Sequence, residues 1–203
     1  QRKELAESGM GFGRRGPREI YKDVKKGEKC DIEILYKSAT AGQNSRLTID
    51  VTERRKAEFD ELKKQVMAYD AVIYAGGITS SQEGEGHERA TIELPAVQQR
   101  CLKALSETGK PVVYVNFSGS CIALADVEPY YSALVQAWYP GQEGGTAIAD
   151  VLFGDFNPSG KLPVTFYKST SQLPDFLDYS MNNRTYRYFQ GDPRYAFGYG
   201  MSY

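Results

Sequence analysis

A repeated order of apolar run, glycine-rich turn and helix-like pattern constrains the fold of this chain most. Residues 70–75 (DAVIYA) and 111–119 (PVVYVNFSG) form nearly continuous apolar runs, which are typical of strands buried on both faces. Between them, residues 94–110 have helical spacing, with Pro95 suited to the first turn and Gly109 to the end. Strand, turn, helix and strand in this order predict a βαβ unit and a mainly parallel sheet.

The same alternation continues on both sides of this unit. Residues 55–70 predict an amphipathic helix, and residues 132–141 and 144–154 predict a third strand and the helix after it. In the helix predicted over residues 55–70, the apolar positions expected to face the core are Phe59, Leu62, Val66 and Tyr69. In the helix predicted over residues 94–110 they are Val97, Cys101 and Leu105. The predicted fold class is therefore α/β, a mainly parallel sheet with helices on both faces.

The chain is expected to hold two parts. Residues 1–53 are predicted to be β-rich, because residues 32–36 and 47–51 alternate and the turn between them has hairpin chemistry. Residues 54–203 form the α/β domain and end in a long wrapping tail rich in tyrosine, glycine and proline. No initiator methionine is present, so we expect an internal piece of a longer protein.

Composition excludes several classes of partner. The chain has 203 residues, 25 of them basic and 26 acidic, and a net charge of −1 gives no electrostatic reason to bind nucleic acid. No apolar run is long enough to span a membrane. The three cysteines, Cys30, Cys101 and Cys121, are too few and too scattered for a disulfide framework or a zinc ribbon.

The loop after the first strand carries the candidate chemistry. Residues 76–91 place Glu83 and Glu85 among glycine, serine and threonine, at the strand end where parallel sheets bind ligands. A nucleotide site is disfavoured, because neither a Gly-x-Gly-x-x-Gly fingerprint nor a P-loop is present. A metal site is also disfavoured, because His87 is the one histidine and only Glu85 and Glu88 flank it.

Two interpretations of the acidic loop remain open from chemistry alone. A serine triad is disfavoured, since Ser118 and Ser120 lie outside a Gly-x-Ser-x-Gly motif. Glycoside hydrolysis needs two carboxyl groups, one of which donates a proton to the leaving oxygen, and a glutamate on a loop can serve as that acid. The alternative is a merely solvated acidic loop.

Residues 70–203 resemble the second, α/β-sandwich domain of glycoside hydrolase family three, the β-glucosidases and β-xylosidases. The motifs that carry the resemblance follow one another along the chain: AGGITSSQEGEGHERATIELPAVQ, GKPVVYVNFSGS, AWYPGQEGGTAIADVLFGDFNPSGKLPVTF, RTYRYF and FGYGMSY. The spacing Glu-x-Glu-Gly-x-x-Arg looks more like the xylosidase and arabinosidase branch than the glucosidases. Residues 1–53 look like the end of a PA14-like insert.

The resemblance implies roles for the loop residues. Glu85 is expected to be the general acid/base, because it occupies the glutamate of the family's Glu-Gly-x-Asp-Arg motif, and Glu83 is the second choice. Arg89 and Glu88 are expected to anchor the loop, and Glu88 stands where the family has aspartate. No metal or other cofactor is implied.

The function predicted is that of a fragment of a retaining exo-acting glycosidase of the β-xylosidase, β-glucosidase or arabinosidase type. The family's nucleophilic aspartate lies on a preceding (β/α)₈ barrel, which this chain lacks, so the fragment is expected to be inactive alone. Its partners would be that barrel and an oligosaccharide or an aryl or alkyl glycoside, in the periplasm or outside the cell. The alternative is a noncatalytic carbohydrate-contacting module, in which Trp138 and Tyr139 could stack on a sugar.

Overall fold

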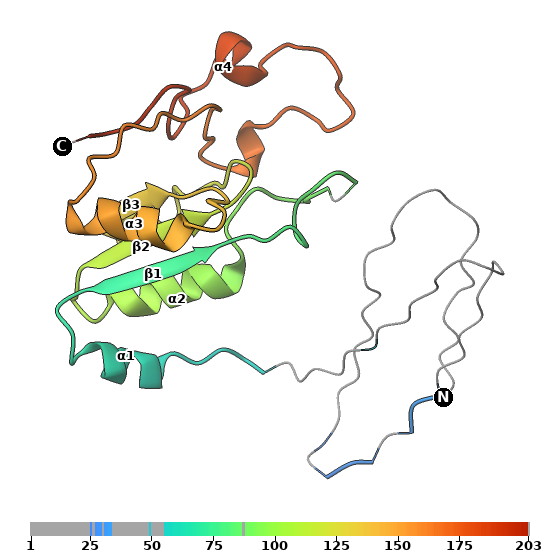
Figure 1. Cartoon of the computed structure of the whole chain (residues 1–203). Helices are drawn as coiled ribbons and strands as arrows, with labels where there is room; N and C mark the ends of the chain where they lie inside the picture. The colour runs from blue at the N-terminus through green and yellow to red at the C-terminus, as the bar shows by residue number, and fades with distance from the viewer. Residues whose placement is uncertain are drawn as a thin grey trace, which may run out of the picture. The chain divides into compact units, whose positions relative to one another are not determined.

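The computed structural model describes residues 25, 27–29, 31–33, 49, 55–86 and 88–202. The chain divides into two compact units, Gln1–Lys56 and Ala57–Tyr203. The helices and strands assigned to the described residues all lie in the second unit (Figure 1). The β-rich segment and hairpin predicted within residues 1–53 lie almost wholly outside the described residues, so they and the PA14-like resemblance stay predictions.

The second unit is built on a three-stranded parallel sheet. Its strands lie in the order β1 (Val72–Gly77), β2 (Val112–Phe117) and β3 (Ala133–Gln136). The last residues of β1 and β2 pair with each other, so the carboxyl ends of these strands are level. Parallel neighbours need a crossover connection, and the helical residues predicted between them supply it. The predicted α/β fold with a parallel sheet is confirmed.

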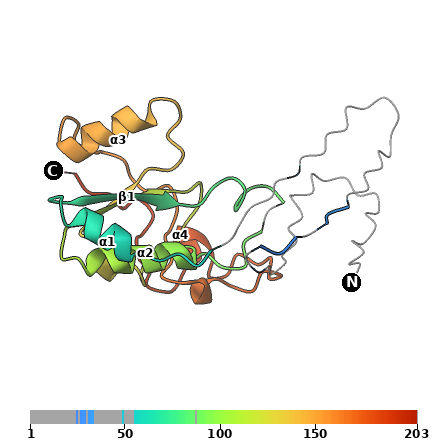
Figure 2. The ribbon, with the colours of Figure 1, turned by 90° about the horizontal axis from the view of Figure 1, so that it is seen from below.

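Helices lie on both faces of this sheet. Figure 2 shows α1 (Asp60–Val66) and α2 (Ala96–Ser106) on one face and α3 (Gly144–Phe153) on the other. The core forms on the α2 side, where Leu102 and Tyr114 are both 0% exposed and belong to one hydrophobic cluster. Burial of such side chains is the main force that holds the helix against the sheet.

The predicted apolar stripe of α2 is partly wrong. Leu105 is buried and Cys101 packs against the core, but Val97 is 43% exposed. In the first turn of α2 it is Gln98 that contacts the sheet. Its side-chain amide forms hydrogen bonds with the backbone of Gly77, the last residue of β1. A polar side chain takes this place because the end of the strand offers backbone groups that need partners.

The predicted core positions before β1 also need one correction. Val66 is buried and Leu62 packs against the core, whereas Tyr69 is 64% exposed. The reason is that α1 ends at Val66, so the helical spacing no longer places Tyr69 on the inward face. None of the described helices is long and apolar enough to cross a membrane.

The C-terminal part is mostly irregular, as its composition predicts. It contains the short helices η2 (Thr170–Gln172) and α4 (Thr185–Tyr188), which follow the turn η1 (Glu128–Tyr130) and helix α3 along the chain. Phe166 is 2% exposed, and its ring lies edge-on to Trp138. Thr170 donates its backbone N–H and its hydroxyl to Glu93, which ties this part to the stretch before α2.

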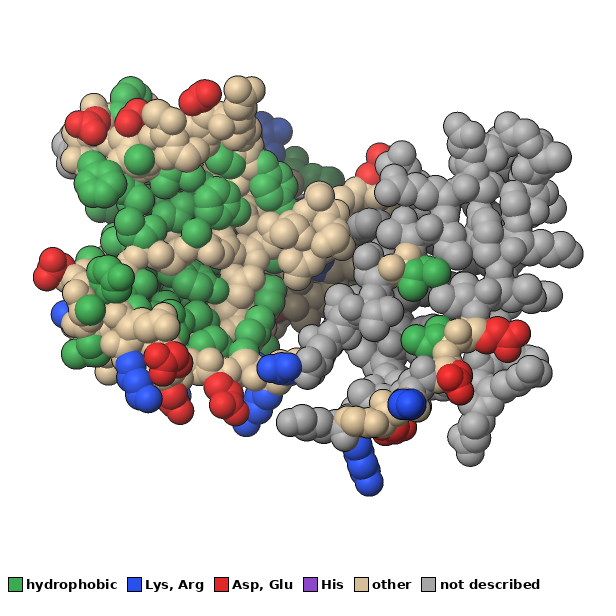
Figure 3. All heavy atoms as spheres, turned by 60° about the horizontal axis from the view of Figure 1, so that its bottom comes forward, with side chains coloured by type: hydrophobic (Ala, Val, Ile, Leu, Met, Phe, Trp, Pro, Cys, Tyr) green, Lys and Arg blue, Asp and Glu red, His purple; other side chains and the backbone are tan. Residues whose placement is uncertain are grey.

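Apolar side chains also remain on the surface of the second unit. Figure 3 shows hydrophobic side chains gathered over a broad face of this unit, with charged groups toward its edges. Ile73 of β1 is 54% exposed, and Phe153 at the end of α3 is 77% exposed. Large exposed apolar surface is characteristic of a contact with another protein surface.

Candidate active site

Three loops follow the carboxyl ends of the three strands. They comprise residues 78–91 after β1, residues 118–121 after β2 and residues 137–143 after β3. Figure 1 shows the first of them, in green, extending beyond the end of β1. In parallel sheets the loops at this edge form the ligand site, so the acidic loop lies where the sequence predicts it.

Backbone contacts fix the start of the acidic loop. Gly77 has a φ of +134°, and a Cβ there would lie 1.9 Å from the carbonyl oxygen of Phe117. The Gln98 side chain accepts the Gly77 N–H at 2.8 Å and donates to the Gly77 carbonyl at 2.6 Å. The chain therefore leaves β1 along one path, which only glycine permits.

Replacing Gly77 with alanine should destabilise the chain by about 3 kcal/mol or more, because both the backbone conformation and the space disfavour a Cβ. Gly109→Ala is the matched control, since Gly109 has a φ of +73° but no atom within 4 Å of its Cβ position. Its cost should be about 1–2 kcal/mol, the strain of the left-handed backbone alone. Urea unfolding measures both, and equal losses would contradict the close contact at Gly77.

Glu83 is the side chain that links the described part of this loop to both neighbouring loops. Its Oε1 accepts the backbone N–H of Gly119 at 2.5 Å and the hydroxyl of Tyr139. Its Oε2 accepts the hydroxyl of Ser120. One carboxylate thus joins the loop after β1 to the loops after β2 and β3.

These contacts keep Glu83 ionised. Partial burial raises the pKa of Glu83, but the hydrogen bonds from Ser120, Tyr139 and Gly119 and the charge of Arg89 outweigh it and leave the pKa below its usual value of 4.5. Burial and the bond to Glu83 raise the pKa of Tyr139 above its usual value, so that hydroxyl stays a donor at neutral pH. A general acid needs a proton to give, and these three donors favour the form without one.

Arg89 connects the other end of the loop to the same turn. Its Nη2 donates to the Ser120 hydroxyl oxygen and to the Cys121 carbonyl, both at 2.9 Å. Glu88 beside it is exposed. These two bonds hold Arg89 to the turn after β2, and the anchoring roles of Arg89 and Glu88 stay predictions.

Glu85 has a different environment from Glu83. It is exposed, and its carboxylate makes no hydrogen bond or ion pair with any residue that the structure describes. Gly84 and Gly86 flank it with φ values of +152° and +73°, so both neighbours adopt backbone conformations that favour glycine. Glu85 therefore lies between Glu83 and Arg89, which both bind the turn after β2, while its own carboxylate is accessible.

A buried polar network supports the turn that receives Glu83. Asn116 and Ser118 are both 0% exposed, and Asn116 accepts from Tyr114 at 2.7 Å and donates to Gln136 of β3 at 2.6 Å. Ser118 donates to the Ser120 carbonyl at 2.8 Å. Neither this network nor the contact of Tyr139 with Glu83 was predicted from the sequence. The one signal for the network is an asparagine inside the otherwise apolar run VVYVNF.

The other candidate residues have structural partners or lie outside the described residues. Ser118 and Ser120 are engaged in the turn, which agrees with the absence of a triad motif. Trp138 packs on Phe166, and His87 lies outside the described residues. Among the residues that the structure describes, no three histidine, cysteine or acidic side chains gather at metal-binding distance.

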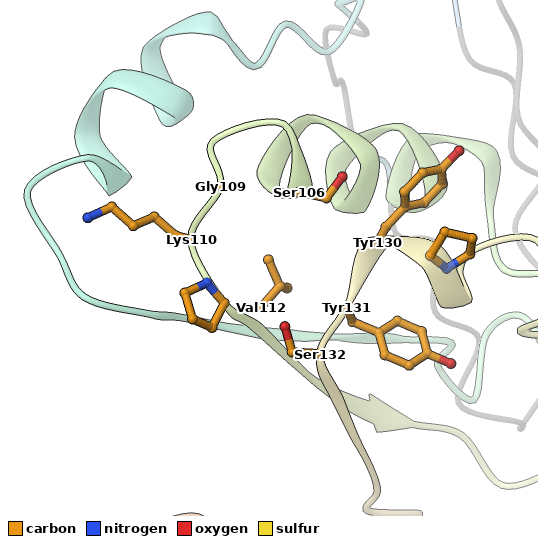
Figure 4. A pocket seen from close by; sticks show the side chains of 9 residues that line it. Ser106, Gly109, Lys110, Val112, Tyr130, Tyr131 and Ser132 are labelled. Atoms are coloured by element: carbon orange, nitrogen blue, oxygen red, sulfur yellow. The ribbon is translucent and has the colours of Figure 1, made fainter.

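A shallow hollow of about 280 Å³ lies at the other end of the sheet (Figure 4). Its lining includes Val112 at the start of β2 and Ser132 just before β3. It is therefore at the amino ends of the strands, away from the acidic loop.

Comparison with known protein families decides what kind of domain this is. The model of the glycosyl hydrolase family 3 C-terminal domain matches residues 5–203. The chain belongs to this family. Solved structures agree with the assignment: a family 3 exo-β-xylosidase in complex with a xylobiose aziridine activity-based probe superposes with a TM-score of 0.65 at 33% identity, covering 71% of this chain and 20% of that one. A β-glucosidase from Kluyveromyces marxianus in complex with glucose superposes with a TM-score of 0.64 at 32% identity, covering 74% of this chain and 20% of that one.

Relatives of this family 3 domain are named as glycosidases. A xylan 1,4-β-xylosidase of Xylanibacter ruminicola is 51% identical over 190 residues, which is 89% of this chain and 22% of the relative. A periplasmic β-glucosidase of Salmonella typhimurium is 38% identical over 160 residues, which is 73% of this chain and 21% of the relative. The chain thus spans about a fifth of the length of these relatives.

Proposed function

We propose that this family 3 domain is the part of a retaining exo-acting β-glycosidase that carries the general acid/base, and that Glu85 is that residue. In the first step Glu85 protonates the leaving oxygen while a carboxylate elsewhere in the polypeptide attacks the sugar carbon. In the second step Glu85 takes a proton from the water that releases the sugar.

The contrast between the two glutamates of the loop carries the choice of Glu85. Glu83 accepts three hydrogen bonds and favours the ionised form, whereas Glu85 is exposed and has no partner among the described residues. An acid/base must contact a substrate and exchange its proton twice in each turnover, and an accessible carboxylate suits that task.

The nucleophile is expected on a barrel domain of the same polypeptide. Retaining glycosidases place the two carboxyl groups roughly 5 Å apart, so the barrel must lie against the loop edge of this sheet. The chain spans 22% of the length of its xylosidase relative, which leaves ample room for such a domain. The exposed apolar surface at Ile73 and Phe153 also suits contact with further protein surface.

We propose a β-xyloside as the first substrate to test, with β-glucosides and arabinosides as alternatives. The support is the 51% identity to a xylan 1,4-β-xylosidase, against 38% to a periplasmic β-glucosidase. The latter relative also supports a location in the periplasm or outside the cell.

The test of the function is to express the complete reading frame that contains this chain and to assay it on aryl β-xylosides, β-glucosides and arabinosides. We expect hydrolysis with release of single sugar units that keep their anomeric configuration. Sugar binding without cleavage, in a polypeptide that has no barrel, would instead establish the noncatalytic carbohydrate-contacting module.

A further inference from the structure

Glu83 forms the centre of an arrangement that the acid/base role of Glu85 does not explain. Its carboxylate takes donors from two other loops, one after β2 and one after β3. Ser120, one of these donors, also accepts from Arg89, so both ends of the segment 84–88 are bound to the same turn. We call Glu83 with its donors Gly119, Ser120 and Tyr139 the Glu83 clamp.

The residues of the clamp are packed closely around Gly119. A Cβ on Gly119 would lie 2.9 Å from the Tyr139 ring and 3.0 Å from Glu83 Oε1, so this position leaves no room for a side chain. Trp138, the residue before Tyr139, has a left-handed backbone with a φ of 57°, which is a strained conformation for a bulky residue. This strained residue directly precedes Tyr139, whose hydroxyl donates to Glu83.

The clamp restricts where Glu85 can be. Two residues of extended chain span at most about 7 Å, so a fixed Glu83 confines the backbone of Glu85 to a small volume. Arg89 sets a wider limit of at most about 14 Å from the other side, because it lies four residues further along the chain. Between these two fixed points Glu85 lies exposed, with Gly84 and Gly86 on either side of it.

We propose that Glu83 is a positioning residue, whose ionised carboxylate, held by Tyr139, Ser120 and the Gly119 amide, fixes the acid/base loop so that Glu85 is presented to the substrate. This inference rests on the proposed role of Glu85. It assigns Glu83 no proton transfer and gives the Tyr139 hydroxyl a task other than stacking on sugar.

The clamp has a defined pH dependence. The charged and titratable side chains that face Glu83 are Arg89 from its own loop and Tyr139 from the loop after β3. Because the pKa of Glu83 in the folded chain lies below its usual value, the clamp is fully formed above about pH 4.5 and is lost as the pH falls through the folded pKa. Across neutral pH it stays closed.

Loop order in this chain tests the clamp without any catalysis. We expect Glu83→Gln to speed hydrogen exchange of amides in residues 78–91 by about tenfold or more, as loss of a bond to a charged group predicts. Tyr139→Phe, which removes only a hydroxyl, should act in the same direction, and the double variant should add little to either change. Glu85→Gln is the matched control and should leave the exchange rates unchanged. Unchanged exchange in both Glu83→Gln and Tyr139→Phe would overturn the clamp.

Kinetics of the complete enzyme test the positioning role. Glu83→Gln should lower kcat/KM by about 10–100-fold for poor leaving groups and by much less for acidic phenols, because a misplaced Glu85 delivers its proton less effectively. A looser loop with unchanged kinetics would overturn the positioning role. A loss as large as that of Glu85→Ala, with loop exchange unchanged, would make Glu83 the acid and overturn both proposals. If Glu85 variants have no kinetic effect while the loop still loosens, the acid/base assignment fails and the clamp stands.

Discussion

Glu85→Ala in the complete enzyme should lower kcat/KM roughly 10²–10⁴-fold for glycosides with poor leaving groups. Such a group must receive a proton as its bond to the sugar breaks, and this variant has no side chain to supply one. Aryl glycosides whose phenol is acidic need no proton and should lose far less in the first step. The measurement is a plot of log kcat/KM against the pKa of the leaving phenol, which should be steeper for the variant than for the parent.

Glu88→Gln provides the matched control for this plot, because it removes an exposed carboxylate from the same loop. Its slope should equal that of the parent enzyme. A Glu85→Ala variant with an unchanged slope would show that the proton comes from a different residue.

The purified 203-residue chain should hydrolyse no aryl glycoside above the uncatalysed rate. On the proposed role of Glu85 it carries one half of the carboxylate pair, and the covalent route needs a nucleophile roughly 5 Å from the acid. An aryl β-xyloside with a highly acidic phenol is the most sensitive substrate for this test. Its phenol leaves without a proton, so the first step requires a nucleophile but no general acid.

The complete enzyme, assayed in the same buffer, shows that the substrate and conditions allow turnover. Hydrolysis by the isolated chain that disappears in Glu85→Gln would mean that this domain holds both carboxyl groups, and the fragment interpretation would be wrong.

Much of the fold could be predicted because the signals are local. The apolar runs that become β1 and β2 are separated by a helix-length segment, and this order alone indicates parallel strands. The orientation of individual side chains was harder, as Val97 and Gln98 show. Apolar spacing placed Val97 inward, but unpaired backbone groups at Gly77 brought Gln98 there instead. That requirement arises from the neighbouring strand and is invisible in the helix itself.

The site was predicted less completely, for the same physical reason. The loop with Glu83 and Glu85 could be singled out because acidic residues follow a buried strand end. The partners of Glu83 could not, since Gly119 and Tyr139 are 36 and 56 residues away along the chain. Only the level carboxyl ends of the strands bring such distant loops together. The roles of Glu83 and Glu85 stay predictions until the variants are measured.

Azide rescue is the most direct test that Glu85 rather than Glu83 is the acid/base. Without Glu85, no base activates the water that breaks down the glycosyl-enzyme, so this second step becomes limiting for activated substrates. Azide is already anionic and can attack the sugar carbon and release the nucleophile's carboxylate without a base. We therefore expect azide to accelerate Glu85→Ala and to yield the β-glycosyl azide, with the configuration of the substrate retained. Glu83→Ala should show neither effect. A β-glycosyl azide from Glu83→Ala and none from Glu85→Ala would contradict the account.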